Sequence, residues 1–259
     1  MFLTLVCSDC LDYLRKTQDS YIDFVLTSPP YDNLRSYKGY TFNFEAIADE
    51  LYRVLKDGGA MVWVVGDSTV SGSETGTSFK QALYFKQIGF NLYDTMIYMK
   101  TNPIPQNHRR YEQCFEYMFV LTKGKPKVFN PIMIPCKSAG KLENWGNRKT
   151  IMDSNQCRRH RDTEVRVTNE TKQHTNVFTY SVGGSKTGHP AVFPLQLALD
   201  QVSTWSNEND LVLDPFCGSG TTGAACKKLN RNFIGVDISQ EYIKLSERRI
   251  DENDICIFQ

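Results

Sequence analysis

The chain has almost no net charge. Its 259 residues include 30 Lys and Arg against 29 Asp and Glu, so that the formal net charge at pH 7 is +1. A polyanionic partner such as a nucleic acid would therefore have to be attracted by local rather than overall positive charge.

Long apolar runs are absent as well. No stretch reaches the length of about 20 apolar residues that a transmembrane helix needs. The first 14 residues, MFLTLVCSDCLDYL, lack the basic segment and the small-residue cleavage site of a secretory signal peptide. We therefore expect a cytoplasmic protein without a membrane partner.

Metal-binding patterns are missing too. Eight cysteines are scattered along the chain, and only Cys7 and Cys10 form a close pair. A structural zinc site needs a second pair of ligands at similar spacing, and none follows. We therefore predict free thiols and no metal ion, with Cys7 at the end of a strand and Cys10 at the start of a helix.

The chain does contain enough hydrophobic residues, 41%, for a sizeable core. They form short runs that alternate between strand-like and helix-like spacing, which indicates an α/β protein. The strands are predicted at residues 3–7, 22–27, 60–66, 92–99, 114–122, 211–214 and 232–237, and the helices at 9–16, 44–55, 79–89, 192–206, 219–229 and 239–250.

Local signals refine three of these elements. Gly58 and Gly59 are predicted to end the second helix. The run AMVWVVG at 60–66 is typical of a buried parallel strand, because both its faces are apolar. Residues 71–78, SGSETGTS, are expected to be a loop, and strands 92–99 and 114–122 are expected to pair antiparallel at one side of the sheet.

Residues 137–186 differ in composition from the rest of the chain. This stretch is polar and has ten Lys and Arg against five Asp and Glu. A second basic segment, the loop 101–113, contains Arg109 and Arg110. These two segments supply the local positive charge that phosphate neutralisation requires.

A glycine-rich turn follows the predicted strand 211–214. Asp214 ends that strand, Gly218 and Gly220 allow a sharp turn, and Asp237 ends the next strand. Ser219, Thr221 and Thr222 are predicted to cap the helix that follows. The turn is neither a dinucleotide-binding GxGxxG nor a Walker sequence, since it lacks the third glycine and the lysine. We therefore expect a ligand with a nucleoside but no phosphates, such as S-adenosylmethionine.

Two motifs resemble those of one family. TSPPY at 27–31 and DPFCGSGTT at 214–222 resemble motifs of the amino-methylating DNA methyltransferases, which act on the exocyclic nitrogen of cytosine or adenine. The order, with the proline corner first, the basic insert central and the glycine turn late, resembles the permuted β-type arrangement. The resemblance implies a Rossmann-like class I methyltransferase sheet with helices on both faces.

That resemblance also implies three segments and a set of cofactor contacts. The segments are a catalytic half at 1–136, a target-recognition insert at 137–186 and a cofactor-binding half at 187–259. Asp9 matches the contact to the cofactor adenine, Asp237 matches the ribose acid, and Cys217 is expected to pack within the turn. The implied cofactor-binding residues are Asp9, His189, Asp214, Pro215, Phe216, Cys217, Gly218, Ser219, Gly220, Thr221 and Asp237. In this family a lysine-proline pair often follows the histidine that His189 matches, and here Phe193 and Pro194 stand in its place.

The corner formed by Ser28, Pro29, Pro30 and Tyr31 suits amine methylation. An exocyclic amino group is a poor nucleophile, because its lone pair is delocalised into the ring. The Pro29 carbonyl can accept an amino hydrogen, and the prolines fix its direction in advance. Ser28 can be the second acceptor, and Tyr31 offers a flat face to a base flipped out of the duplex.

The identity of the target base rests on Ser28. In the family, serine at this place resembles the cytosine-N4 group, whereas aspartate is usual in the adenine-N6 group. Cytosine carbon-5 methylation is disfavoured, because the corner holds no cysteine nucleophile. Adenine-N6 methylation remains the alternative, and a catalytically inactive DNA-binding specificity subunit is a third.

Double-stranded DNA is the expected partner. The candidate DNA-binding residues are Arg35, Tyr37, Arg109, Arg110, Arg158, Arg159 and Arg161. The resemblance makes a homodimer and a companion restriction endonuclease further expectations.

Overall fold

The computed structural model describes residues 1–30, 42–103, 109–144, 150–151, 157–158, 165–181 and 194–252. The chain divides into two compact units, which are described separately. One comprises residues 1–130 and 176–259, and the other comprises residues 131–175.

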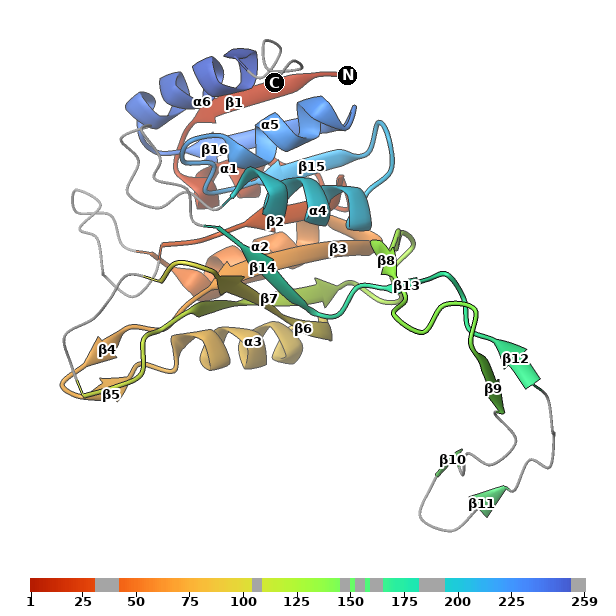
Figure 1. Ribbon diagram of the computed structural model, residues 1–259. Helices are drawn as coiled ribbons and strands as arrows, with labels where there is room; N and C mark the ends of the chain where they lie inside the picture. The colour runs from red at the N-terminus through yellow and green to blue at the C-terminus, as the bar shows by residue number, and fades with distance from the viewer. Residues whose placement is uncertain are drawn as a thin grey trace. The chain divides into compact units, whose positions relative to one another are not determined.

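The larger unit is built on an eight-stranded sheet with the order β1-β16-β15-β2-β3-β7-β6-β14 (Figure 1). Its strands are β1 (Leu3–Cys7), β2 (Ile22–Thr27), β3 (Leu55–Val65), β6 (Asn91–Lys100), β7 (Phe115–Thr122), β14 (Val177–Tyr180), β15 (Leu211–Asp214) and β16 (Asn232–Asp237). Strand β7 pairs antiparallel with β3 and β6, and the other pairs are parallel. The carboxyl ends of seven strands therefore meet at one edge.

Helices cover both faces of this sheet. They are α1 (Cys10–Lys16), α2 (Phe44–Val54), α3 (Thr77–Gln87), α4 (Leu195–Trp205), α5 (Thr221–Lys228) and α6 (Gln240–Glu252). One buried cluster joins side chains of α1, α2 and α3 to the sheet, and a second joins those of α4, α5 and α6. The predicted sheet with helices on both faces is confirmed.

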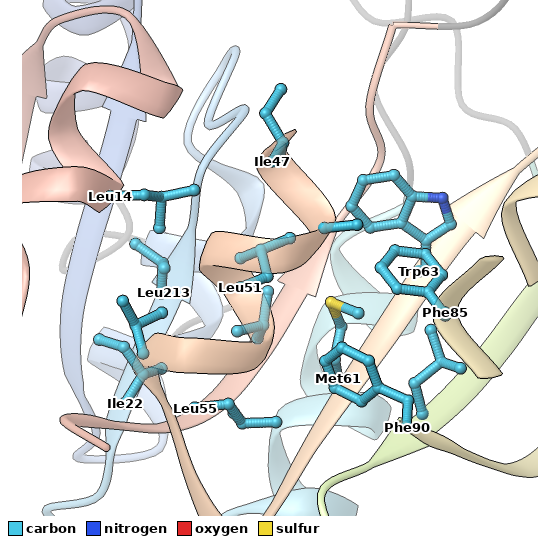
Figure 2. Close-up of a cluster of buried hydrophobic side chains, with 14 of the residues drawn as sticks. Leu14, Ile22, Ile47, Leu51, Leu55, Met61, Trp63, Phe85, Phe90 and Leu213 are labelled. Carbon is cyan, nitrogen blue, oxygen red and sulfur yellow. The ribbon is translucent and has the colours of Figure 1, made fainter. Parts of the chain in front are cut away.

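Strand β3 shows why both faces are apolar. Met61, Trp63 and Val65 lie in the first cluster, whereas Val62 and Val64 lie in the second. Figure 2 shows the first cluster, in which the Trp63 ring meets Phe85 edge-to-face at a centroid distance of 5.2 Å. The continuous apolar run at 60–66 is thus the signature of a strand that is buried on both sides.

The prediction for Gly58 and Gly59 was wrong. Helix α2 ends at Val54, and β3 already includes both glycines. The pairing of β2 with β3 jumps from Ile22 with Leu55 to Phe24 with Ala60, so the glycines lie in a bulge. Gly58 adopts φ +79°, a left-handed conformation that favours glycine. The bulge, and not the end of a helix, therefore explains the glycine.

Two further expectations need correction. Residues 71–78 contain part of a small hairpin, β4 (Thr69–Val70) and β5 (Ser73–Glu74), before α3 begins at Thr77. Strand β14 was predicted to be part of the polar insert, but it pairs in parallel with β6 at the sheet edge. The antiparallel pairing of β6 with β7 is as predicted.

The smaller unit consists of nested antiparallel pairs. The pairs are β8 (Met133–Pro135) with β13 (Thr171–Gln173), β9 (Leu142–Asn144) with β12 (Val165–Val167), and β10 (Thr150–Ile151) with β11 (Cys157–Arg158). Because each pair lies inside the previous one in sequence, the segment forms a long hairpin. It overlaps the basic stretch predicted at 137–186.

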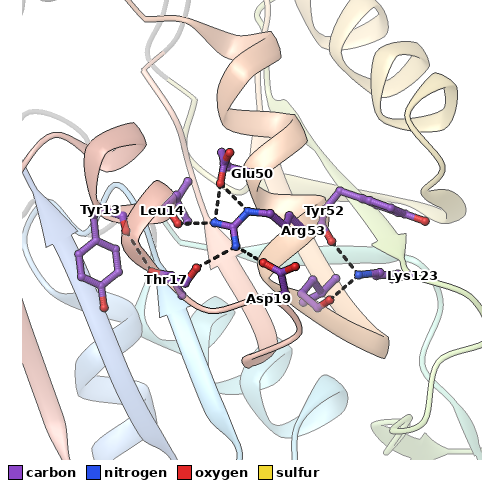
Figure 3. A network of polar contacts seen from close by, with 9 residues as sticks. Tyr13, Leu14, Thr17, Asp19, Glu50, Tyr52, Arg53 and Lys123 are labelled. Carbon is purple, nitrogen blue, oxygen red and sulfur yellow. Dashed lines mark hydrogen bonds and ion pairs between the residues drawn. The ribbon is translucent and has the colours of Figure 1, made fainter.

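A polar network joins α1 to α2 on the first face (Figure 3). The Arg53 guanidinium donates to the Leu14 and Thr17 carbonyl oxygens at 2.7 and 2.8 Å and also pairs with Asp19 and Glu50. One planar guanidinium thereby donates to four acceptor groups, which a lysine ammonium could not do. Within the described part of the chain, no helix has the length and apolar character to cross a membrane.

Candidate active site

Four segments meet at the carboxyl edge of the sheet. Strands β1, β16, β15 and β2 are neighbours and run parallel. At the ends of these strands, or just after them, lie Asp9, Asp237, Asp214 and Thr27. These residues are neighbours at the edge although they are far apart in the sequence. Open α/β sheets bind their ligands at this edge, where the loops after the strands converge.

Asp214 lies at the centre of this edge and is almost fully buried. Its Oδ1 accepts hydrogen bonds from the Thr27 hydroxyl at 2.7 Å and from the Phe216 amide at 3.2 Å. Its Oδ2 accepts from the Thr222 hydroxyl at 2.7 Å. Burial raises the pKa of Asp214 to about 6, although these hydrogen bonds oppose the rise.

The bond between Thr27 and Asp214 joins the two sequence motifs. Thr27 immediately precedes Ser28, Pro29 and Pro30, and Asp214 begins the glycine turn 187 positions later. Because Thr27 is fully buried, the corner and the turn are held in a defined relative position. Sequence reasoning missed this role, and its one available signal was a hydroxyl residue at the end of an apolar strand.

The glycine turn has the shape that its residues predict. Gly218 and Gly220 adopt φ values of +53° and +76°, in the left-handed region that favours glycine. The Gly218 amide donates to Asp237 Oδ2 at 2.9 Å, and the Ser239 amide donates to Asp237 Oδ1 at 2.8 Å. A carboxylate has about four acceptor sites, so Asp237 can accept further hydroxyl donors. Burial raises the pKa of Asp237 as well.

Asp9 follows the neighbouring strand β1. Its Oδ1 caps α1 by accepting from the amides of Leu11 and Asp12 at 2.9 and 3.1 Å. The Ser8 amide donates to the Asp237 carbonyl at 3.0 Å, which ties this turn to β16. Cys7 ends the strand and Cys10 opens the helix, as predicted.

The capping prediction for the glycine turn was wrong. Helix α5 begins after Gly220, and no side chain caps it. The Thr222 hydroxyl instead binds Asp214, and the hydroxyls of Ser219 and Thr221 accept from Arg249 on α6 at 2.8 Å each. Hydroxyl residues beside a helix start favour caps, but here the buried Asp214 carboxylate and the half-buried Arg249 guanidinium compete for them.

The remaining residues of the turn pack against the sheet and both buried clusters. Phe216 is half-buried and meets the rings of Phe42 and Trp63 at centroid distances of 5.7 and 6.4 Å. Pro215 and Cys217 are buried, and burial raises the pKa of the Cys217 thiol well above its usual value. Cys217 is therefore a packing residue, as expected, and is unsuited to nucleophilic attack.

Not every predicted site residue can be placed. Pro29 is buried, and Ser28 and Pro30 are half-buried at the end of β2. The following predicted site residues lie outside the described part of the chain: Tyr31, Arg35, Tyr37, Arg159, Arg161 and His189. Arg158 belongs to β11, and its side chain is not described.

Arg109 and Arg110 are both exposed in the loop after β6. Arg110 donates to the Gly72 carbonyl and lies 3.7 Å from the Glu74 carboxylate. Part of its positive charge is therefore neutralised within the protein. Among the described residues, no group of three His, Cys, Asp or Glu side chains could hold a metal ion.

A parallel-strand edge with a glycine turn and an acid at the end of the next strand is typical of α/β proteins that bind a ligand with a nucleoside. A family model described as DNA methylase, N6_N4_Mtase, matches residues 22–248. Orphan methyltransferase M.BamHII of Bacillus amyloliquefaciens is 46% identical over 246 residues, which cover 90% of this chain and 89% of that protein. The chain therefore belongs to the N6_N4_Mtase family of DNA methylases.

Solved structures of similar fold agree with this assignment. The crystal structure of the M1.HpyAVI–SAM complex is 25% identical, with a TM-score of 0.62 over 96% of this chain and 100% of that one. PvuII DNA methyltransferase (cytosine-N4-specific) is 18% identical and shares the fold, with a TM-score of 0.68 over 96% of this chain and 87% of that one. The predicted class I methyltransferase architecture is confirmed.

Proposed function

We propose that this DNA methylase transfers the methyl group of S-adenosylmethionine to the exocyclic N4 of a cytosine that is flipped out of duplex DNA. The observation that carries the proposal is the 2.7 Å hydrogen bond between Thr27 and Asp214. It holds the proline corner beside the glycine turn. A target base at the proline corner and a cofactor at the glycine turn can then be aligned for an in-line displacement, in which the amine attacks the methyl group.

The residues at the edge fit the cofactor. S-adenosylmethionine supplies an electrophilic methyl group on a sulfonium, and it carries a nucleoside without phosphates. Asp237 has acceptor sites suited to ribose hydroxyls, and the glycines at 218 and 220 permit close approach of a ligand to the backbone. Asp9 and Phe216, at the flanks of the same edge, would complete the cofactor site with Pro215, Ser219 and Thr221.

The proline corner would hold the target amine. The Pro29 carbonyl and the Ser28 hydroxyl accept the amino hydrogens and turn the nitrogen lone pair toward the methyl group. Tyr31 stacks on the base. Positioning of this kind contributes roughly 7–11 kcal/mol in favourable cases, and no strong base is needed because the methylated nitrogen is cationic and loses its proton readily.

Two features support cytosine as the target and the permuted subgroup as the closer class. Ser28 stands where a carboxylate is usual for adenine-N6 enzymes. The corner follows β2 early in the chain, and the glycine turn follows β15 late, with the basic segment between them. Adenine-N6 methylation is the alternative. Retention of both motifs disfavours an inactive specificity subunit.

DNA would contact the two basic segments of the chain. We infer that the part of the basic stretch that lies in the smaller unit, residues 137–175, selects the target sequence, with Arg158, Arg159 and Arg161 as phosphate or base contacts. Arg35, Tyr37, Arg109 and Arg110 would be further DNA contacts. A homodimer, a companion endonuclease and a cytoplasmic location remain predictions.

Nucleoside analysis tests the proposal directly. DNA from a methylation-free host that expresses the protein is digested to nucleosides and weighed, and we expect N4-methylcytosine. N6-methyladenine would establish the alternative, and the absence of both would refute enzymatic activity. Asp237→Asn should abolish the product, whereas Asp57→Asn should leave it unchanged. Asp57 is the matched control because its side chain is exposed and lies in β3, before the buried run that ends at the site.

A further inference from the structure

Helix α6 contacts the glycine turn through two side chains. The Ser246 hydroxyl donates to the Gly218 carbonyl at 2.7 Å. The Arg249 guanidinium donates to the hydroxyls of Ser219 and Thr221 at 2.8 Å each, and to the Ser219 carbonyl at 3.5 Å. Ser246 and Arg249 lie three positions apart, so they project from one face of the helix. We call these two residues the α6 contact face.

The α6 contact face rests on a well-packed helix. Ile243 and Ile250 are buried on the same side, and Ile250 belongs to the second hydrophobic cluster. The Lys227 ammonium donates to the Ile250 carbonyl at 3.1 Å, which joins α6 to α5. Figure 1 shows α6 lying along the sheet beside β1. Its position is therefore set by packing and does not depend on the glycine turn alone.

The glycine turn needs such a support. Gly218 and Gly220 give its backbone many accessible conformations when it is not restrained. Helix α5 begins without a side-chain cap, so the turn lacks the usual local restraint. The hydroxyls of Ser219 and Thr221 point to Arg249 instead. Helix α6, far along the chain, thus restrains the turn in addition to Asp237, which accepts from the Gly218 amide.

The lack of space around Gly220 shows that the glycine turn and α6 are in close contact. A Cβ atom added to Gly220 would lie 2.9 Å from the Ser246 Cβ and 3.0 Å from its Oγ. Ser246 is fully buried, and a larger side chain on either residue would push the turn away from the helix. The turn and the α6 contact face are therefore fitted to each other.

We propose that Ser246 and Arg249 are positioning residues for the methyl donor, which hold the glycine turn in the conformation that binds it. This inference rests on the proposed function, in which the turn binds S-adenosylmethionine. A turn that adopts the binding conformation for only a fraction of the time binds with an affinity reduced by that fraction. If the fraction falls to about one tenth in a variant, the dissociation constant rises roughly tenfold.

The test compares variants on one helix. Arg249→Met removes the three hydrogen bonds and keeps most of the side-chain length, and Arg249→Lys keeps a cationic donor group. Ser246→Ala removes the bond to the Gly218 carbonyl and the 3.7 Å contact with the Cys217 sulfur. Arg248→Met is the matched control, because Arg248 is exposed and its one hydrogen bond within the described part of the chain goes to the Lys244 carbonyl of its own helix. Titration calorimetry with S-adenosylmethionine should give a dissociation constant about tenfold weaker for Arg249→Met and an unchanged one for Arg248→Met. Arg249→Lys should fall between them.

Kinetics separates positioning from a structural role. In DNA methylation assays we expect the KM for S-adenosylmethionine to rise with the dissociation constant, while kcat at saturating donor and the KM for DNA stay unchanged. Wild-type protein that fails to bind S-adenosylmethionine would refute the proposed function itself. Wild-type binding combined with unchanged affinity in Arg249→Met and Ser246→Ala, whether or not their urea midpoints fall, would overturn this inference alone.

Discussion

Thr27→Val tests whether a hydrogen bond to a buried carboxylate holds the two motifs together. Thr27 is fully buried, and valine has nearly the same shape, so the substitution removes little except the donor. That donor lies 2.7 Å from Asp214 Oδ1. Asp214 keeps the Thr222 hydroxyl and the Phe216 amide as its remaining donors.

The cost of this substitution depends on pH. Burial raises the pKa of Asp214 to about 6, above the unfolded value, so the folded protein holds a proton that the unfolded chain releases. Stability from this group is therefore present at low pH and is lost as the pH rises through about 4 to 6, by roughly 3 kcal/mol in total. A hydrogen bond to the ionised carboxylate is worth roughly 1.5–3 kcal/mol, and one to the neutral acid about 1 kcal/mol.

Thr27→Val should therefore destabilise the protein by about 2 kcal/mol at pH 8 and by about 1 kcal/mol at pH 5. Urea unfolding of wild type and variant at both pH values measures the two differences. Thr122→Val is the matched control, because Thr122 is also fully buried but its hydroxyl donates to a neutral acceptor, the Gly124 carbonyl, at 2.8 Å. Its cost should be the same at both pH values.

The outcome of this comparison is clear in either direction. A Thr27→Val cost of about 2 kcal/mol at both pH values would mean that Asp214 is already ionised at pH 5 and would contradict its raised pKa. A cost of about 1 kcal/mol at both pH values, or one that is larger at pH 5, would refute a stronger bond of Thr27 to the ionised Asp214.

Three further predictions follow from the same structure. Gly220→Ala should lose at least about 2 kcal/mol in urea unfolding, because of its φ of +76° and its contact with Ser246, and wild-type stability would contradict the close fit. Arg53→Lys should cost roughly 1–3 kcal/mol by the same measurement, since an ammonium cannot serve four acceptors, and a neutral result would show that the network in Figure 3 contributes nothing. In the folded protein the exposed Cys7 should react with a thiol reagent well before the buried Cys217, as peptide mapping of the labelled protein would report, and equal rates would contradict the burial of the glycine turn.

Much of the fold was predictable because its signals are local. The apolar run at 60–66 indicates a strand that is buried on both faces, and it forms most of β3. The regular spacing of apolar residues located α2, α3 and α4 to within a few positions. Local signals failed where glycine had two meanings, since Gly58 and Gly59 form a bulge rather than a helix end.

The candidate site, like the fold, could be predicted only in part. The residues of the proline corner and the glycine turn were identifiable because rigid corners and sharp turns require particular backbones, which only proline and glycine supply readily. The partners of the hydroxyl residues were not identifiable. Ser219 and Thr221 looked like caps, and only the packing of α6 explains why they bind Arg249.

The sequence by itself therefore determined the family of this protein and the two motifs of its site, because those motifs are short and depend on backbone chemistry that is written locally. The tertiary structure alone decided how the motifs are joined. Thr27 meets Asp214 because β2 and β15 are neighbours in the sheet, and α6 reaches the glycine turn because its apolar face packs beside β1 and α5. Contacts between residues so far apart in sequence depend on strand order and helix packing, which no local pattern encodes.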